Sequence, residues 1–158
     1  MKKELLKGVT MLMVIVVLAF ATAVVSANAQ SSNRVVAEIP FQFTVGDRAM
    51  PSGKYAVKAT NMQGIALIIQ SADAKRAAVR LTNSMEPTKA NERAKLVFHR
   101  YGERYFLAEV WSGGSNTGRE LVKSRQERAI ERELASNGLR SELAQTKYEV
   151  VEIVATLH

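Results

Sequence analysis

Apolar and polar residues alternate along much of the chain after its N-terminal segment, and this two-residue period is typical of half-buried β-strands. Phe41, Phe43 and Val45 alternate with polar neighbours, whereas Pro40 marks an edge or a break because proline cannot donate a hydrogen bond to an adjacent strand. Further strands are expected over residues 54–59, 65–69 and 77–81, with turns at 46–48, 50–53, 61–64 and 73–76. The polar stretch 83–93 is expected to be a loop.

The clearest hairpin joins residues 94–100 to 104–111 through Tyr101-Gly102-Glu103, a short connection that contains Gly. Strict alternation places Tyr105, Leu107, Glu109 and Trp111 on one face, and Phe106, Ala108 and Val110 on the other. Both faces are apolar, so the hairpin either packs on both sides or exposes an aromatic face that binds a ligand or a sugar. Core packing is favoured, because strand aromatics in a small domain mostly lie in the core. The candidate ligand-binding residues of the alternative are Tyr105, Trp111, Glu109, His99, Arg100 and Arg104.

The hydrophobic period changes after the Gly-rich segment 112–118, and it predicts a helix over residues 119–136, followed by a strand over 147–155. The apolar stripe of this helix is narrow, so the helix is expected on the surface. The stripe consists of Val122, Gln126, Ala129, Ile130 and Leu134. Interleaved Arg and Glu residues favour a solvated outer face, and a docking surface for a partner or an anionic membrane is the alternative.

Strands that recur about every ten residues with turns between them predict a mainly β fold. We expect a small antiparallel β-sandwich or barrel with one C-terminal surface helix. The alternation pattern is the same for both architectures, so it leaves sandwich and barrel open.

The first 29 residues have the three parts of a secretory signal: a basic start, an apolar run and small residues before a cleavage site. The run extends from Val9 to Val25, and Ala27 and Ala29 fit the small pockets of signal peptidase. We therefore expect a signal peptide over 1–29, cleavage after Ala29, and an exported, periplasmic or secreted domain over 30–158. A retained transmembrane anchor is the alternative, because the run just reaches the length that spans a bilayer.

Removal of this segment would leave 129 residues, which suits a single domain with its own hydrophobic core. Three Lys and one Glu leave with it, so the formal net charge falls from +7 to +5. Outside the cytoplasm, a basic excess favours an envelope protein, a glycan or a lipid as partner over nucleic acid. Contact with a membrane is expected only through an uncleaved signal segment. The simplest interpretation of the positive charge is that it keeps the protein soluble. The chain has no Cys, which excludes disulfides, thiol catalysis and cysteine metal sites.

Residues suited to catalysis or to metal binding are sparse. His99 lies among arginines and His158 ends the chain, so neither a zinc site nor a Ser-His-Asp arrangement is expected. Glu103 and Glu109 form a carboxylate pair on the hairpin, but the first lies in the turn, where carboxylates are usually solvated. The segment 113–118 lacks the Gly-Lys-Ser/Thr ending of a phosphate-binding loop. We therefore expect no catalytic residue, no metal and no cofactor.

Two spans of the chain resemble a group of small hypothetical exported bacterial proteins. These spans are Ile39–Tyr55, which reads IPFQFTVGDRAMPSGKY, and the hairpin 96–111 together with Gly118–Leu121. Members of the group share a signal peptide, a PFxFxVGxxxxPxGxY opening and an aromatic hairpin. The resemblance extends to about Ala135 and implies an exported β-rich fold, but no activity. The opening also has a physical interpretation, because its Pro fixes one corner of a turn and its Gly relaxes another.

These observations favour an exported, non-enzymatic β domain that binds a partner or has a structural role in the bacterial cell envelope. The alternative is a small β-barrel that carries an apolar ligand in a cavity lined by Phe41, Phe43, Tyr55 and Phe106. A hydrolase of envelope material ranks last.

Overall fold

The computed structural model describes residues 34–60, 65–86, 93–114, 117–138 and 148–158, which all belong to one compact unit. The expected signal segment 1–29, its cleavage residues Ala27 and Ala29, and the turn predicted at 61–64 lie outside these residues. The strands are β1 (Val35–Ile39), β2 (Phe43–Val45), β3 (Arg48–Met50), β4 (Gly53–Ala59), β5 (Ala66–Ser71), β6 (Ala77–Met85), β7 (Lys95–Tyr101), β8 (Arg104–Trp111), β9 (Gly118–Leu121), β10 (Glu149–Val154) and β11 (Thr156–Leu157). The helix α2 (Arg125–Gly138) lies between β9 and β10 in the chain.

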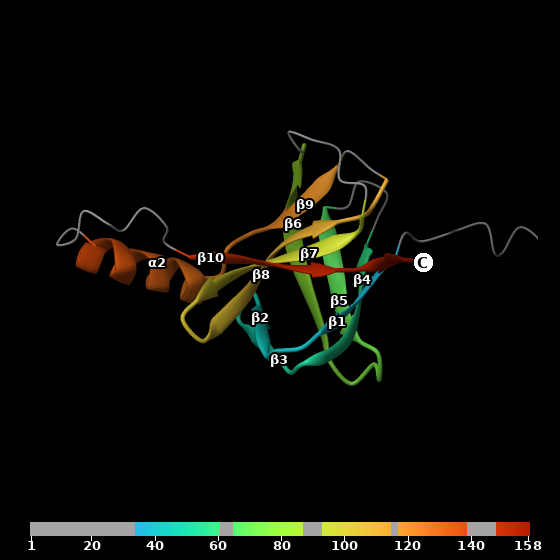
Figure 1. Cartoon of the computed structure of the whole chain (residues 1–158), viewed down its shortest axis with the longest axis horizontal. Coiled ribbons are helices and arrows are strands. Elements are labelled where there is room, and N and C mark those ends of the chain that lie inside the picture. Colours follow the sequence, from blue (N-terminus) through green and yellow to red (C-terminus); the bar gives the residue numbers. More distant parts are fainter. Residues whose placement is uncertain (1–33, 61–64, 87–92, 115–116, 139–147) are drawn as a thin grey trace, which may run out of the picture. The chain divides into compact units, whose positions relative to one another are not determined.

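The strands form one largely antiparallel sheet in the order β10-β7-β8-β9-β6-β5-β4-β1-β11 (Figure 1). The β2–β3 hairpin lies off this path, and β2 pairs in parallel with β8 through Thr44 and Phe106. Only Ala155 separates β10 from β11, so the two ends of the path are consecutive segments of the C-terminus. The prediction of a mainly β fold with one helix near the C-terminus is confirmed.

Aromatic side chains fill the centre of the core. The ring of Phe43 meets the rings of Tyr55 and Phe98 edge to face, with centroids 5.0 and 5.5 Å apart. Each of these three side chains is almost completely buried, and burial of one such ring contributes roughly 1.5–3 kcal/mol. The Tyr55 hydroxyl donates a hydrogen bond of 2.7 Å to the carbonyl of Pro51. The Pro and the Tyr of the opening motif therefore close the turn before β4 against the core.

A register shift in the β7–β8 hairpin divides the aromatic residues between two faces. Val97 pairs with Glu109, but the next residue, Phe98, pairs with Leu107, which leaves Ala108 as the extra residue of a β-bulge. Leu107 and Val110 consequently both face the core. The predicted common face of Tyr105, Leu107, Glu109 and Trp111 is therefore wrong, because the bulge inverts the alternation after Ala108.

The predicted helix over 119–136 begins too early. Residues 118–121 form β9, which pairs with β6 and β8, and α2 starts only at Arg125. The predicted loop 83–93 also starts too early, since β6 continues to Met85 through its pairing with β9. The short β3 and β11 were not predicted, whereas β10 lies within the last predicted strand, 147–155. For β6 and β9, a partner strand decides where pairing stops, and the local sequence does not encode that partner.

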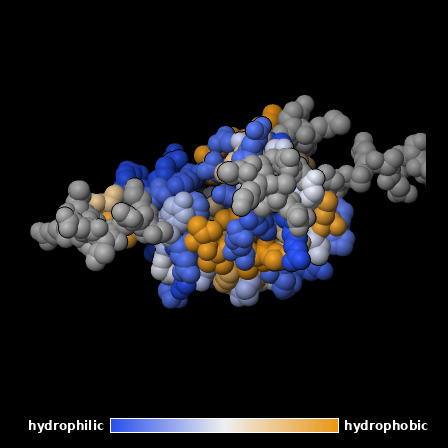
Figure 2. Space-filling view, turned by 45° about the horizontal axis from the view of Figure 1, so that its top comes forward, coloured by the Kyte–Doolittle hydropathy of each residue, from blue (hydrophilic) through white to orange (hydrophobic). Residues whose placement is uncertain are grey.

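Apolar side chains also reach the surface, where Figure 2 shows orange patches between hydrophilic regions on one face. The large exposed ones are Ile65, Val79, Leu81, Val122, Leu134, Val150, Val154 and Leu157. Within the described residues, no helix is both long enough and apolar enough to cross a membrane.

Candidate functional site

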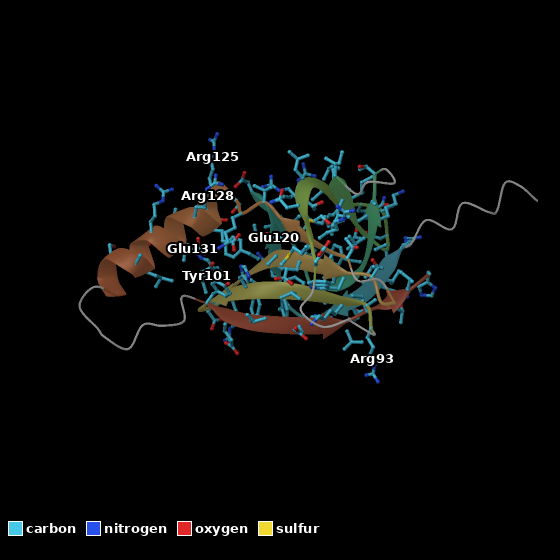
Figure 3. All side chains as sticks on the ribbon, turned by 90° about the horizontal axis from the view of Figure 1, so that it is seen from above. Arg93, Tyr101, Glu120, Arg125, Arg128 and Glu131 are labelled. Atoms are coloured by element: carbon cyan, nitrogen blue, oxygen red, sulfur yellow. The ribbon has the colours of Figure 1, made fainter. Side chains whose placement is uncertain are left out.

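A cluster of polar side chains joins α2 to the outer face of the β7–β8 hairpin. The alternation along β7 directs Phe98 into the core, and it directs His99 and Tyr101 to the opposite face. The first turns of α2 cover that face. Figure 3 shows Tyr101 and Glu131 close together beneath the helix, whereas Arg125 and Arg128 point away from the strands.

Ser124 fixes the start of α2 and so positions the central carboxylate of the cluster. Its hydroxyl accepts a 3.0 Å hydrogen bond from the backbone amide of Glu127, which is the geometry of a helix N-cap. The Glu127 carboxylate turns toward the sheet, where its Oε1 lies 2.9 Å from Nδ1 of His99. Only 3% of Glu127 and 7% of His99 is exposed, so this pair is removed from water.

Tyr101 connects this pair to a second carboxylate. Its hydroxyl lies 3.4 Å from Oε1 of Glu127 and donates a 3.0 Å hydrogen bond to Oε1 of Glu131. The same Glu131 oxygen accepts a 2.6 Å hydrogen bond from the Lys123 ammonium group. The ring of Tyr148 stacks on His99 with centroids 3.9 Å apart. Side chains from β7, α2 and the segments next to α2 and β10 thus converge in one network.

Two groups of the network hold their protons more firmly than usual. Burial raises the pKa of Tyr101 far above its ordinary value, and its hydrogen bond to Glu131 and the negative charges of both carboxylates raise it further. Burial lowers the pKa of Lys123, but its hydrogen bond and charge attraction to Glu131, with help from Glu127, outweigh that effect and raise it overall. Tyr101 is therefore a neutral donor and Lys123 a cation at neutral pH.

The docked face of α2 differs from the predicted stripe. Glu127 is buried and Ile130 and Glu131 are half-buried, whereas Gln126 and Ala129, which belong to the predicted stripe, are exposed. The prediction followed the helical spacing of the mostly apolar residues, but the helix docks through carboxylates that hydrogen-bond to the sheet. As a result, two of the acidic residues that are interleaved with the arginines, Glu127 and Glu131, contact side chains of the sheet and do not belong to a solvated outer face.

A hollow of about 600 Å³ lies beside the network, between the middle of α2 and the tip of the hairpin. The helix contributes the apolar side chains Ile130 and Leu134 to its lining. The remaining lining residues are Arg100, Tyr101, Gly102, Glu103, Tyr148 and Glu149. The hollow therefore has one apolar wall and a rim with charges of both signs.

Arg100 and Tyr105, two of the predicted binding residues, lie together near the hairpin tip. The Arg100 guanidinium is 5.5 Å from the centroid of the Tyr105 ring. The same guanidinium donates hydrogen bonds of 2.8 Å to the carbonyl of Gly102 and 2.9 Å to the carboxylate of Glu149. Tyr105 is half-buried and stacks on Phe41 with centroids 3.9 Å apart.

The other predicted binding residues do not join that pair. His99 lies on the opposite face of β7, inside the network under α2. Trp111 is only 5% exposed, and its indole N–H donates a 2.7 Å hydrogen bond to Glu109 at the far end of β8. Arg104 is exposed next to the turn. The six residues therefore form no common surface, because the bulge and α2 separate them.

The chemistry open to the network is limited by what its members already contact. In the part of the chain that the structure describes, the hydrogen-bond partner of His99 is a carboxylate and not a hydroxyl nucleophile. Among the same residues, no group of three or more His, Asp and Glu side chains is placed to hold a metal ion. The network is suited to holding α2 in place and to shaping the hollow beside it.

Sequence reasoning missed Ser124, Glu127, Glu131, Lys123 and Tyr148. A signal for two of them was present, because Ser124-Arg125-Gln126-Glu127 has the Ser-x-x-Glu spacing of a capping box and marks a helix start at Arg125. Comparison with protein-family models, with curated proteins and with solved structures finds no match for this chain.

Proposed function

We propose that this chain is an exported, non-enzymatic domain of the bacterial cell envelope that acts by binding a protein partner through the hollow between α2 and the β7–β8 hairpin. The observation that carries this proposal is the hollow itself, about 600 Å³ in volume and walled on one side by Ile130 and Leu134. Its volume lies in the range of small binding sites, roughly 300–1,000 Å³. An apolar wall within a charged rim is the arrangement of a typical protein–protein contact.

The network under α2 supports this role by making the wall rigid. Glu127 and Glu131 fix the first turns of the helix to β7, so Ile130 and Leu134 extend from a firmly held base. Arg100 and Glu149 form a 2.9 Å ion pair at the rim and offer one charge of each sign to a partner. Preorganisation of this kind reduces the entropy lost on binding.

The core gives less support to the carrier alternative. Phe41, Phe43 and Tyr55 pack against Phe98 or against one another through edge-to-face ring contacts. Phe106, the fourth residue of the expected cavity wall, contacts Tyr101 on the outer face of the hairpin. These four residues therefore do not surround one common space.

Export is tested by the mass of the protein recovered from an exporting bacterial host. A mass that matches residues 30–158 supports cleavage after Ala29, and the full-length mass supports the anchor alternative. Binding is tested by placing a photo-crosslinking amino acid at Leu134 in those cells. The matched control is Leu157, which is similarly exposed (44% against 42%) but lies on β11.

We expect a discrete crosslinked product at position 134 and none at position 157. An Ile130→Glu substitution should abolish the product, because it places a charge on the apolar wall. Equal products at both positions, or a product that Ile130→Glu leaves unchanged, would contradict binding through this hollow.

A further inference from the structure

A second hollow, of about 550 Å³, lies where the turn between β2 and β3 meets the first half of β6. Its polar lining residues are Asp47, Arg48 and Arg80, and no residue lines both this hollow and the one beside α2. Arg80 is two residues after Ala78, which belongs to the hydrophobic core, so strand alternation directs the Arg80 side chain to the inner face of β6. A cation is thereby held at the border of the core.

The Arg80 side chain is only partly satisfied in this position. One terminal nitrogen donates a 3.2 Å hydrogen bond to the carbonyl of Val122. Its Nε is buried and has no hydrogen-bond partner. Buried polar atoms without a partner are rare in native proteins, and each one requires a physical explanation, such as a bound water or ion.

Gly46 makes room for this arginine. Its backbone has a φ of +63°, as the first position of a tight two-residue turn requires. A Cβ at this position would lie 2.4 Å from Cζ of Arg80, so any other residue would displace the guanidinium group. The Gly of the opening motif thus has a second use besides turn formation, because it accommodates the Arg80 side chain.

Arg48 contributes the second guanidinium group. One of its terminal nitrogens donates a hydrogen bond to the carbonyl of Ala77. Across the described residues, neither Arg48 nor Arg80 forms an ion pair with a carboxylate, although Asp47 lines the same hollow. The charges of the lining residues therefore sum to a net positive value.

We infer that this hollow binds an oxyanion, the phosphate or carboxylate group of a small molecule or of a polymer end, between Arg48 and Arg80. Guanidinium groups offer several N–H donors in a planar fork that matches the oxygens of both groups. An oxyanion would neutralise two cations that the described residues leave without a counter-charge, and it would supply acceptors for their remaining terminal N–H donors. This inference is independent of the α2 hollow.

The test is a nuclear magnetic resonance titration of the protein recovered from the exporting host, with the Nε–H signals of its arginines as the readout. Inorganic phosphate and glucuronate are titrated separately at constant ionic strength, so that phosphate and carboxylate are distinguished. We expect the Nε–H signals of Arg48 and Arg80 to shift saturably with at least one of them. Arg48→Gln and Arg80→Gln should each raise the Kd by at least about tenfold, which corresponds to about 1.4 kcal/mol.

The matched control is Arg104→Gln, which removes an exposed positive charge on the hairpin and should leave the Kd within about twofold. Circular dichroism checks that each variant is folded. If Arg80→Gln does not fold, Arg48→Gln alone decides, because the Arg48 side chain is exposed. The absence of a saturable shift with either anion, or an equal loss in Arg104→Gln, would overturn the assignment.

Discussion

Replacement of Glu127 by Ala tests whether the buried network holds α2 on the sheet. The substitution removes the carboxylate that lies 2.9 Å from Nδ1 of His99, and it leaves that nitrogen without its acceptor in a site where 7% of the histidine is exposed. Tyr101 keeps its 3.0 Å hydrogen bond to Glu131, so the loss is concentrated on His99. The N-cap bond from the Glu127 amide to Ser124 uses the backbone and survives the change.

The expected cost follows from these contacts. A buried donor that loses its partner costs about 1–3 kcal/mol of stability. The shorter Ala side chain also makes fewer packing contacts at this buried position, which adds to that loss. We therefore expect Glu127→Ala to lower the free energy of unfolding by about 2 kcal/mol. Ala favours a helix more than Glu does, and this gain must be subtracted. Glu133→Ala supplies that correction, because Glu133 is an exposed residue of the same helix.

The assay is urea denaturation followed by the fluorescence of Trp111, which is the single tryptophan of the chain and is 5% exposed. A double-mutant cycle with His99→Ala isolates the pair, since the two substitutions together should cost less than the sum of their separate costs by about 1–2 kcal/mol. Costs that add independently would refute the reasoning. So would a Glu127→Ala effect within about 0.5 kcal/mol of the Glu133→Ala effect, which is the range of ordinary surface substitutions.

Two further predictions concern the hairpin and the network. Gly118→Ala should lower the free energy of unfolding by about 1–3 kcal/mol and shift the fluorescence emission of Trp111, because the added Cβ would lie 2.5 Å from the indole ring. Unchanged stability and emission would contradict this packing. Stability should also fall as the pH rises above about 10. The raised pKa values of Tyr101 and Lys123 mean that the folded protein binds these protons more tightly than the unfolded chain does. The stability gained from this tighter binding is complete only below the ordinary pKa values of the two groups, and it is lost as the pH rises through the raised ones. Denaturation of Tyr101→Phe between pH 9 and pH 11.5 should give a smaller loss, and a curve parallel to that of the unsubstituted protein would count against the argument.

The amino-acid sequence alone determined the mainly β fold, most of the strand positions and the β7–β8 hairpin. These features depend on local rules, since a two-residue alternation and turn-forming Gly and Pro act within a few residues. The end of α2 was predicted at residue 136, close to its observed end at Gly138, for the same reason, because Asn and Gly favour a helix stop. Its start was also encoded locally by Ser124 and Glu127, but the run of charged residues before it was mistaken for helix.

Only the tertiary structure decided which face each side chain occupies and which polar groups meet. The bulge at Ala108 moves Trp111 to the face opposite Tyr105, and the register between β7 and β8 sets that bulge. The burial of Glu127 depends on His99 and Tyr101, which belong to a strand far away in the sequence. The contact between Gly46 and Arg80 joins a turn to a distant strand in the same way. Hydropathy ranks a residue by its own side chain, whereas a buried charge is stabilised by partners that the chain brings together only when it folds.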